Sequence, residues 1–221
     1  TLRMGTWNIT SYTGTNRGSA FQNAIYGTYQ GRSFAPDVLF AQEIESPSAA
    51  QTFRGLLNTA AGSPGDWNVI FNTLTGSSVR TNANGLTGNR QIMAVGDFNW
   101  QSSSQTAWTT FTGSTSNNNG RFFDPINTTG SWTENNNFRY VHTQDPSGAG
   151  GMDDRYDLML MGGKLGDGIG TEYVGAFGTA YSTTTWNDPN HSYRVWGNDG
   201  TSFNDTLTTT GNTMVGSSLA Q

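Results

Sequence analysis

Acidic and amide residues accompany several apolar segments of this chain, and these residue types bind divalent cations and phosphate groups. The motifs are, in chain order, Trp7-Asn8, Gln42-Glu43, Gly96-Asp97-Phe98-Asn99 and Arg155-Tyr156-Asp157. Each lies in or beside a run that is typical of a β-strand, and open α/β folds gather their binding residues at strand ends. Carboxylates and amides repeated at such ends suit a divalent cation and a phosphate ester. The pattern therefore predicts a phosphoester site.

Asp97 and Asn99 stand two residues apart at the end of an apolar run. On an extended segment, side chains at this spacing point to the same face. Phosphodiester hydrolysis needs an oriented water and relief of charge on the nonbridging oxygens. A carboxylate can orient the water, and a neutral amide can bind the phosphoryl oxygens. The alternative is an Asp-Phe-Asn turn that merely ends a strand, which is the commoner explanation for this motif taken alone.

Glu43 ends the run Pro-Asp-Val-Leu-Phe-Ala-Gln-Glu. Because Mg²⁺ is commonly held by one or two carboxylates together with water, a single glutamate beside Asn8 suits a sparse metal site. The alternative is a solvated acid at a strand end, and Glu45 fits that description better. Trp7 is predicted to be a core residue.

The joint order of the four motifs resembles the endonuclease/exonuclease/phosphatase superfamily, the DNase I-like metal-dependent phosphoesterases, over nearly the whole chain. The resemblance implies that Glu43 and Asn8 bind Mg²⁺ (or Mn²⁺ or Ca²⁺), that Asp97 orients water and that Asn99 contacts phosphate. It implies that Asp157 supports a catalytic histidine. The implied fold is a four-layer α/β sandwich of two packed, mostly antiparallel sheets flanked by helices, as in secreted bacterial members.

Two histidine-bearing signatures of that family are missing. About two dozen residues separate a predicted strand at 67–71 from the Gly-Asp-Phe-Asn strand, too few for the family's further strands and histidine segment. The chain also stops at Gln221, before a terminal Ser-Asp-His motif. We therefore expect an internal gap near 72–79 and a missing C-terminal strand. His142 is predicted to be a packed residue and His191 an exposed turn residue, while Asp153 and Asp154 are predicted to be loop acids.

Hydrophobic periodicity gives the elements that must position these residues. Strands are expected at 2–8, 38–43, 67–71, 91–95, 138–142, 156–161 and 171–177. Helices are expected over 18 to about 30, from a Ser46 cap with Pro47 in the first turn to near 62, over 79–86 and over 102–110. The last forty residues are expected to form a long loop ordered by its aromatic side chains. The whole chain, 1–221, is expected to be one domain.

Composition narrows the function further. The chain has 221 residues, 12% charged and 12% aromatic, which argues against disorder. Its net charge is −5 and its ten arginines and single Lys164 are scattered, which weighs against tight nonspecific nucleic-acid binding but not against a smaller phosphate ester.

The absence of cysteine excludes disulfides, thiolate metal sites and cysteine nucleophiles. No apolar stretch approaches the ~20 residues of a membrane span. Low lysine and a Ser/Thr/Asn/Gly-rich composition favour a secreted bacterial protein, with Thr1 a processed N-terminus.

The leading hypothesis is therefore a Mg²⁺-dependent phosphoesterase, nuclease-like or phosphatase-like. Its substrate is DNA, RNA, a phospholipid head group or a small phosphate ester. The alternative is a catalytically inactive extracellular binding or structural module on the same fold, since abundant Asn, Thr, Gly and aromatic residues suit carbohydrate contact. A third hypothesis, a glycosidase with Glu43 and Asp97 as its carboxylate pair, requires a suitable separation of the two acids.

Overall fold

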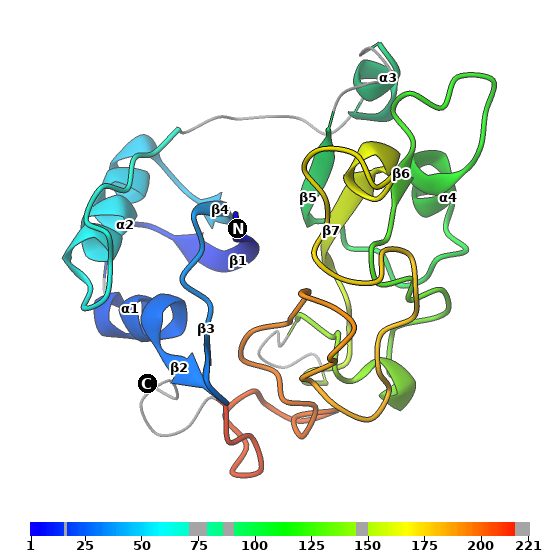
Figure 1. Cartoon of the computed structure of the whole chain (residues 1–221). Coiled ribbons are helices and arrows are strands. Elements are labelled where there is room, and N and C mark those ends of the chain that lie inside the picture. The colour runs from blue at the N-terminus through cyan, green and yellow to red at the C-terminus, as the bar shows by residue number, and fades with distance from the viewer. Residues whose placement is uncertain (16, 71–78, 86–90, 145–149, 215–221) are drawn as a thin grey trace.

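The computed structural model describes residues 1–15, 17–70, 79–85, 91–144 and 150–214. Their arrangement confirms the predicted mixed α/β class (Figure 1). The elements are β1 (Met4–Tyr12), α1 (Gly18–Tyr26), β2 (Thr28–Tyr29), β3 (Arg32–Ser33), β4 (Val38–Ile44), α2 (Pro47–Thr59), α3 (Val79–Asn84), β5 (Met93–Asp97), α4 (Thr106–Thr112), β6 (Phe122–Phe123), β7 (Asp157–Gly162) and the short 3₁₀ helices η1 (Asn136–Phe138) and η2 (Gly163–Leu165). Residues 72–78, where an internal gap was expected, lie outside the described ranges.

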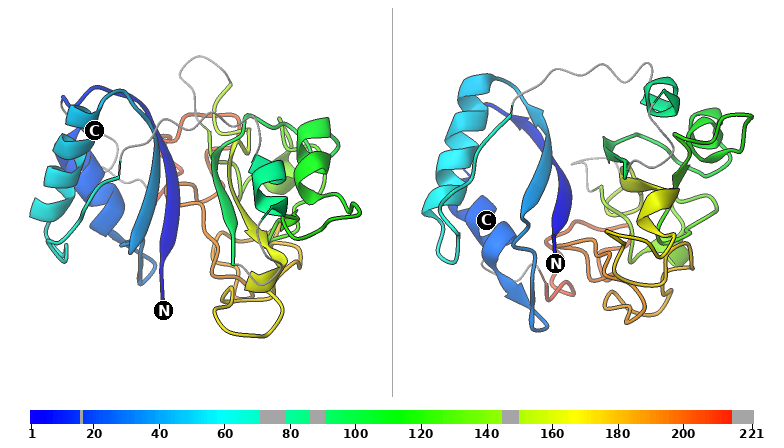
Figure 2. Two further views of the ribbon diagram at one scale, coloured as in Figure 1. Left: turned by 90° about the horizontal axis from the view of Figure 1, so that it is seen from above. Right: turned by 45° about the horizontal axis from the view of Figure 1, so that its top comes forward.

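The first half of the chain forms a two-stranded parallel sheet covered on one side by two helices. β1 pairs with β4 in a register that sets Asn8 beside Gln42. Helices α1 and α2 lie on the side of this sheet away from β5 and β7 (Figures 1 and 2). The buried side chains between helices and sheet are Ile9, Tyr12, Phe21, Ile25, Ala49, Phe53 and Leu57. Because neighbours along a strand face opposite ways, packing of Trp7 on this core turns Asn8 toward the other face.

Helix α2 begins where the sequence predicted it to begin. The Ser46 hydroxyl accepts the backbone N–H of Ala49 at 3.1 Å, and Pro47 occupies the first turn. This cap satisfies one of the amide groups that a helix start leaves without a partner. Helix α1 ends at Tyr26, earlier than predicted, since Thr28 and Tyr29 pair with Arg32 and Ser33 in a short hairpin.

The second half contains the antiparallel sheet β5–β7–β6, with α3 and α4 on its outer side (Figure 2). Three tryptophans and one phenylalanine dominate its core, which consists of Ala83, Ala94, Trp100, Trp108, Phe122, Trp132, Leu158 and Leu160. β1 contacts β5 and β7, and β4 contacts β5, so the two larger sheets approach each other on the faces that the helices leave open. The middle of β1 and the end of β4 therefore lie beside the end of β5 and the start of β7.

The C-terminal part, as far as residue 214, is the long irregular segment that the sequence predicted. It packs through buried aromatic residues, among them Trp186 (3% exposed) and Tyr193 (9% exposed). Together with Ile126, Val141 and Tyr181, Tyr193 forms a third small core. No helix in the part of the chain that the structure describes is long and apolar enough to cross a membrane.

The strand predicted at 67–71 is wrong for residues 67–70, which have no regular structure, and Phe71 lies outside the described residues. The Asn58 side chain explains the difference. Its oxygen accepts the Trp67 N–H at 2.7 Å, and its nitrogen donates to the Trp67 carbonyl at 3.2 Å. These bonds take the backbone groups that a neighbouring strand would need.

The strands predicted at 138–142 and 171–177 are also wrong. Phe138 ends η1 and residues 139–141 form consecutive turns, in which the N–H of Val141 bonds to the carbonyl of Phe138. The apolar alternation there reflects packing of turns against two cores rather than a pleated strand. Residues 171–177 make one isolated bridge, between Gly175 and His191, because glycines interrupt the apolar run.

Candidate active site

Three of the predicted site residues are joined directly by hydrogen bonds. The Asn8 side-chain nitrogen donates to Glu43 Oε1 at 2.8 Å and to Asp97 Oδ2 at 3.0 Å. Asn8 comes from β1, Glu43 from β4 and Asp97 from the end of β5. The three side chains are thus brought together from segments up to 89 residues apart. Glu43 and Asp97 lie at strand ends, as predicted, whereas Asn8 lies in the middle of β1, where the regular pairing with β4 stops.

Local backbone geometry holds Glu43 in place. Glu43 has φ +58°, and Thr10 and Ser11 across from it have φ +47° and +46°, which non-glycine residues rarely adopt. The register of β1 against β4 shifts at this point. The Ser11 N–H donates to Glu43 Oε2 at 3.0 Å, and the Thr10 N–H donates to the Asn8 amide oxygen at 2.9 Å. Such strained positions cost of order 1–3 kcal/mol each and concentrate at functional sites.

Asn99 does not extend the strand as its spacing from Asp97 suggested. β5 ends at Asp97, and Asn99 takes a left-handed backbone conformation with φ +51°. Its backbone N–H, rather than its side chain, contacts Asp97, donating to Oδ1 at 2.9 Å. The Asn99 side chain is exposed and makes no hydrogen bond to any other residue in the described ranges. It is therefore free to meet a ligand.

Asp157 lies directly across the β5–β7 ladder from Asp97. Its backbone N–H donates to the Thr143 hydroxyl at 2.9 Å, and its carboxyl oxygen Oδ1 is buried without a hydrogen-bond partner among the described atoms. Burial, together with the nearby negative charges of Asp97 and Glu43, raises the pKa of Asp157 to about 7, although hydrogen bonds from Thr143 and the Asn8 backbone act to lower it. Both the protonated and the ionised forms of this carboxyl group are therefore populated near neutral pH.

The raised pKa gives a stability prediction with a definite sign. Between pH 4 and pH 7 the folded protein binds more protons at Asp157 than the unfolded chain does, so the free energy of unfolding falls as pH rises through this window. In EDTA, the free energy of unfolding of the wild type should fall between pH 4.5 and pH 8 by at least about 1.4 kcal/mol more than that of Asp157→Asn. This is the free energy that corresponds to one pKa unit. Urea unfolding at pH 4.5 and pH 8 measures this, and equal losses in the two proteins would contradict it.

Neither histidine of the chain is available to this cluster. His142 is fully buried, with Nδ1 3.2 Å from the Met152 carbonyl and Nε2 2.9 Å from the Trp132 carbonyl. This confirms that it is a packed residue. His191 was expected to be exposed, but it is only 4% exposed, because Tyr173 and Thr179 contact its two ring nitrogens.

Asp157 therefore has no histidine partner in the part of the chain described here. Asp153 and Asp154 lie in the loop before β7, as predicted, although both are buried.

The donor atoms suit a hard divalent cation. The Glu43 and Asp97 carboxylates converge on one point, now occupied by the Asn8 amide nitrogen. No group of three or more His, Cys, Asp or Glu side chains that could hold a metal ion occurs within the described residues. A cation here would take its remaining ligands from water or substrate, which is the common arrangement for Mg²⁺. Asn8 would have to turn its amide oxygen away from the Thr10 N–H to join Glu43 as a ligand.

Two residues of this site were not predicted from the sequence. Ser11 contributes a backbone N–H to Glu43, and Thr143 contributes a hydroxyl to Asp157. Neither residue belongs to a recognisable sequence motif, because each contacts a residue that is distant in the sequence.

Comparison of the chain with protein-family models, curated proteins and solved structures found no match.

Proposed function

We propose that this protein is a divalent-metal-dependent phosphoesterase of the DNase I-like type, acting on phosphodiester or phosphomonoester bonds. The observation that carries the proposal is that Asn8, in the middle of β1, contacts Glu43 and Asp97 at the ends of β4 and β5, with Asp157 at the start of β7 opposite Asp97. Two acids joined through an amide, with a third acid behind them, suit metal-assisted hydrolysis better than a structural role. A stability-only cluster would gain nothing by crowding three carboxyl groups.

The order of layers supports the finer fold assignment. Helices α1 and α2, the β1–β4 sheet, the β5–β7–β6 sheet and helices α3 and α4 follow one another across the molecule (Figure 2). A four-layer α/β sandwich has this order. This order supports the DNase I-like proposal, although the β1–β4 sheet is parallel and not antiparallel as expected. Secretion from a bacterial cell is a further part of the proposal and rests on composition alone.

Each residue has a role in the proposed reaction. Glu43 and Asn8 would hold Mg²⁺, Mn²⁺ or Ca²⁺, which when bound stabilises charge on the phosphoryl group. Asp97, fixed by the Asn99 N–H and by Asn8, would orient the attacking water. The free Asn99 amide would bind a phosphoryl oxygen without adding negative charge. Asp157, whose pKa lies near 7, would exchange a proton close to the reacting groups.

Hydrolysis of bis(p-nitrophenyl) phosphate and p-nitrophenyl phosphate, with each metal or with EDTA, tests the proposal. We expect metal-dependent turnover that falls at least about 100-fold in Glu43→Gln, a loss of about 2.7 kcal/mol of transition-state stabilisation. Glu45→Gln is the matched control, because Glu45 is an exposed glutamate two residues away. Equal activity in the two variants would contradict the role of Glu43.

The engagement of both histidines elsewhere favours one second candidate, a noncatalytic extracellular binding or structural module on the same fold. Such a module would hydrolyse neither ester with any metal. Its function would also survive neutralisation of Glu43 and Asp97. The same assay therefore separates the two candidates.

A further inference from the structure

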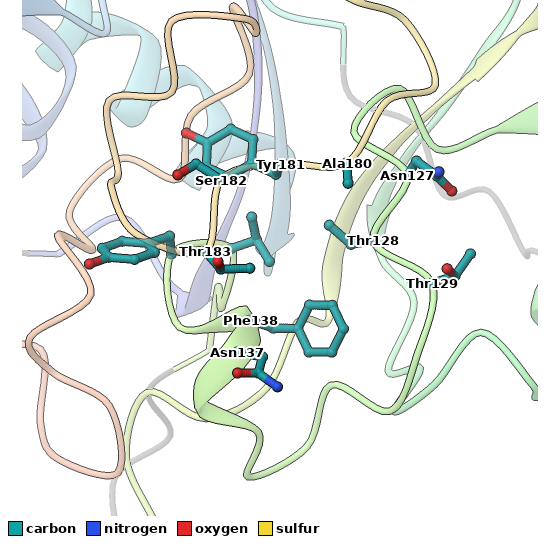
Figure 3. Close-up of a pocket in the computed structure, with 11 residues that line it drawn as sticks. Asn127, Thr128, Thr129, Asn137, Phe138, Ala180, Tyr181, Ser182 and Thr183 are labelled. Atoms are coloured by element: carbon teal, nitrogen blue, oxygen red, sulfur yellow. The ribbon is translucent and has the colours of Figure 1, made fainter.

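A cavity of about 230 Å³ lies among three loop segments of the second half of the chain. Figure 3 shows Tyr181 and Ser182 on one side of it, Asn137 and Phe138 on the opposite side, and the segment 127–129 along a third. None of the residues lining the cavity belongs to the strand-end cluster, by which we mean Asn8, Glu43, Asp97 and Asp157. It is therefore a second candidate site.

Aromatic side chains form its walls and are fixed from behind. The Tyr181 hydroxyl donates to the carbonyls of Trp186 and Tyr193, and its ring stacks on His191 at 5.6 Å between centroids. The Tyr140 hydroxyl donates to the Thr184 carbonyl at 3.1 Å. Because these rings are held before any ligand arrives, binding would cost little ordering of the walls.

Polar groups around the cavity are left open. The side chains of Asn127, Thr129, Asn137 and Thr183 make no hydrogen bond to another residue within the described ranges, and all four residues are exposed. An amide offers both donors and an acceptor, and a hydroxyl offers one donor and two acceptor lone pairs. The cavity thus combines an apolar wall with a rim that can both donate and accept.

No acidic, basic or histidine residue lines the cavity. A charged ligand would lose its hydration there without gaining a counter-charge, which is costly. The volume is below the ~300–1,000 Å³ of sites for drug-sized ligands, so it fits one ring. The open polar groups stand on several sides (Figure 3), as do the hydroxyls around a sugar, whereas a nucleobase carries its polar atoms in one plane.

We propose that this cavity binds a single neutral sugar ring, packed against Tyr181 and Phe138 and hydrogen-bonded by Asn137 and Asn127. This site is independent of the proposed phosphoesterase site. A sugar at the end of a surface glycan has the required size, neutrality and hydroxyl pattern.

Ligand-observed saturation-transfer NMR tests the proposal, with the methyl glycosides of glucose, mannose, galactose and N-acetylglucosamine as probes and adenosine as a non-sugar probe. We expect at least one glycoside to bind with a Kd near 1 mM, a weak but measurable affinity. EDTA in every sample keeps the result independent of metal-dependent catalysis.

Variants decide whether the bound glycoside occupies this cavity. Asn137→Ala should weaken binding at least about tenfold, and Ala180→Trp, which fills the cavity from its exposed edge, should abolish it. Asn136→Ala is the matched control, since Asn136 is an exposed neighbour on the same 3₁₀ helix that does not line the cavity. The proposal is overturned if no glycoside binds, if adenosine binds more tightly than every glycoside, or if binding survives Ala180→Trp.

Discussion

Asp97→Asn is expected to lower metal-dependent phosphodiester turnover by about 10²–10⁴-fold, the usual contribution of a group that activates water, without unfolding the protein. Asp97 accepts two hydrogen bonds at the centre of the site, from the Asn99 backbone and from Asn8. Asparagine has nearly the same shape but carries no negative charge to orient or deprotonate water. The measurement is kcat and KM for bis(p-nitrophenyl) phosphate, with the thermal midpoint of each protein.

Two further variants make this test sharp. Asp66→Asn is the matched control, because Asp66 is an exposed aspartate in the loop after α2. Asp97→Glu keeps the charge but moves it by one methylene, and it should also lose at least about tenfold in kcat, since a misplacement of 1 Å can cost that much or more. Turnover of Asp97→Asn within threefold of wild type, at an unchanged thermal midpoint, would remove Asp97 from the catalytic machinery.

Local sequence signals predicted the parts of the fold that depend on local chemistry. The apolar runs gave β1, β4, β5 and β7 to within a few residues, and Ser46-Pro47 gave the start of α2. The ends of β4 and β5 also bring Glu43 and Asp97 together, although Asn8, which contacts both, lies in the middle of β1. Those predictions succeeded because period-2 alternation and capping act over a few residues.

Features that depend on contacts between residues far apart in the sequence could not be predicted from local sequence patterns. The Asn58 side chain removes a strand at Trp67, and Tyr173 and Thr179 bury His191 in what looked like an exposed turn. The left-handed conformation of Asn99 separates its side chain from that of Asp97 in a way that an extended segment would not. Each case rests on hydrogen bonds or dihedral angles that an apolar pattern does not encode.

Arg155 is the clearest example of such a partner. Its place beside Tyr156 and Asp157 suggested part of a site motif, yet its side chain is fully buried. It contacts Asp124 with both terminal nitrogens, at 2.8 and 3.0 Å, and also contacts the Thr128 hydroxyl. Burial alone would raise the pKa of Asp124, but the Arg155 charge and its hydrogen bonds lower it below its ordinary value. The pair therefore carries two full charges in the core, just before β7.

Removing one partner of this pair should be far more damaging than removing both. Arg155→Met leaves the Asp124 charge buried without compensation, and we expect a loss of about 3–5 kcal/mol in the free energy of unfolding. Arg155→Met with Asp124→Asn should recover more than half of that loss, because the remaining amide is neutral. Urea unfolding at pH 7 measures both variants.

The matched control is Arg139→Met, which removes a partly exposed arginine that lies over the Tyr140 ring at 4.5 Å. It should cost no more than about 1 kcal/mol. If Arg155→Met cost as little as this control, or if the double variant recovered nothing, charge compensation would not explain the burial of Arg155. If the expected order holds, the ion pair fixes the segment that delivers Asp157 to the strand-end cluster, and the single variant should then lose phosphoesterase activity together with stability.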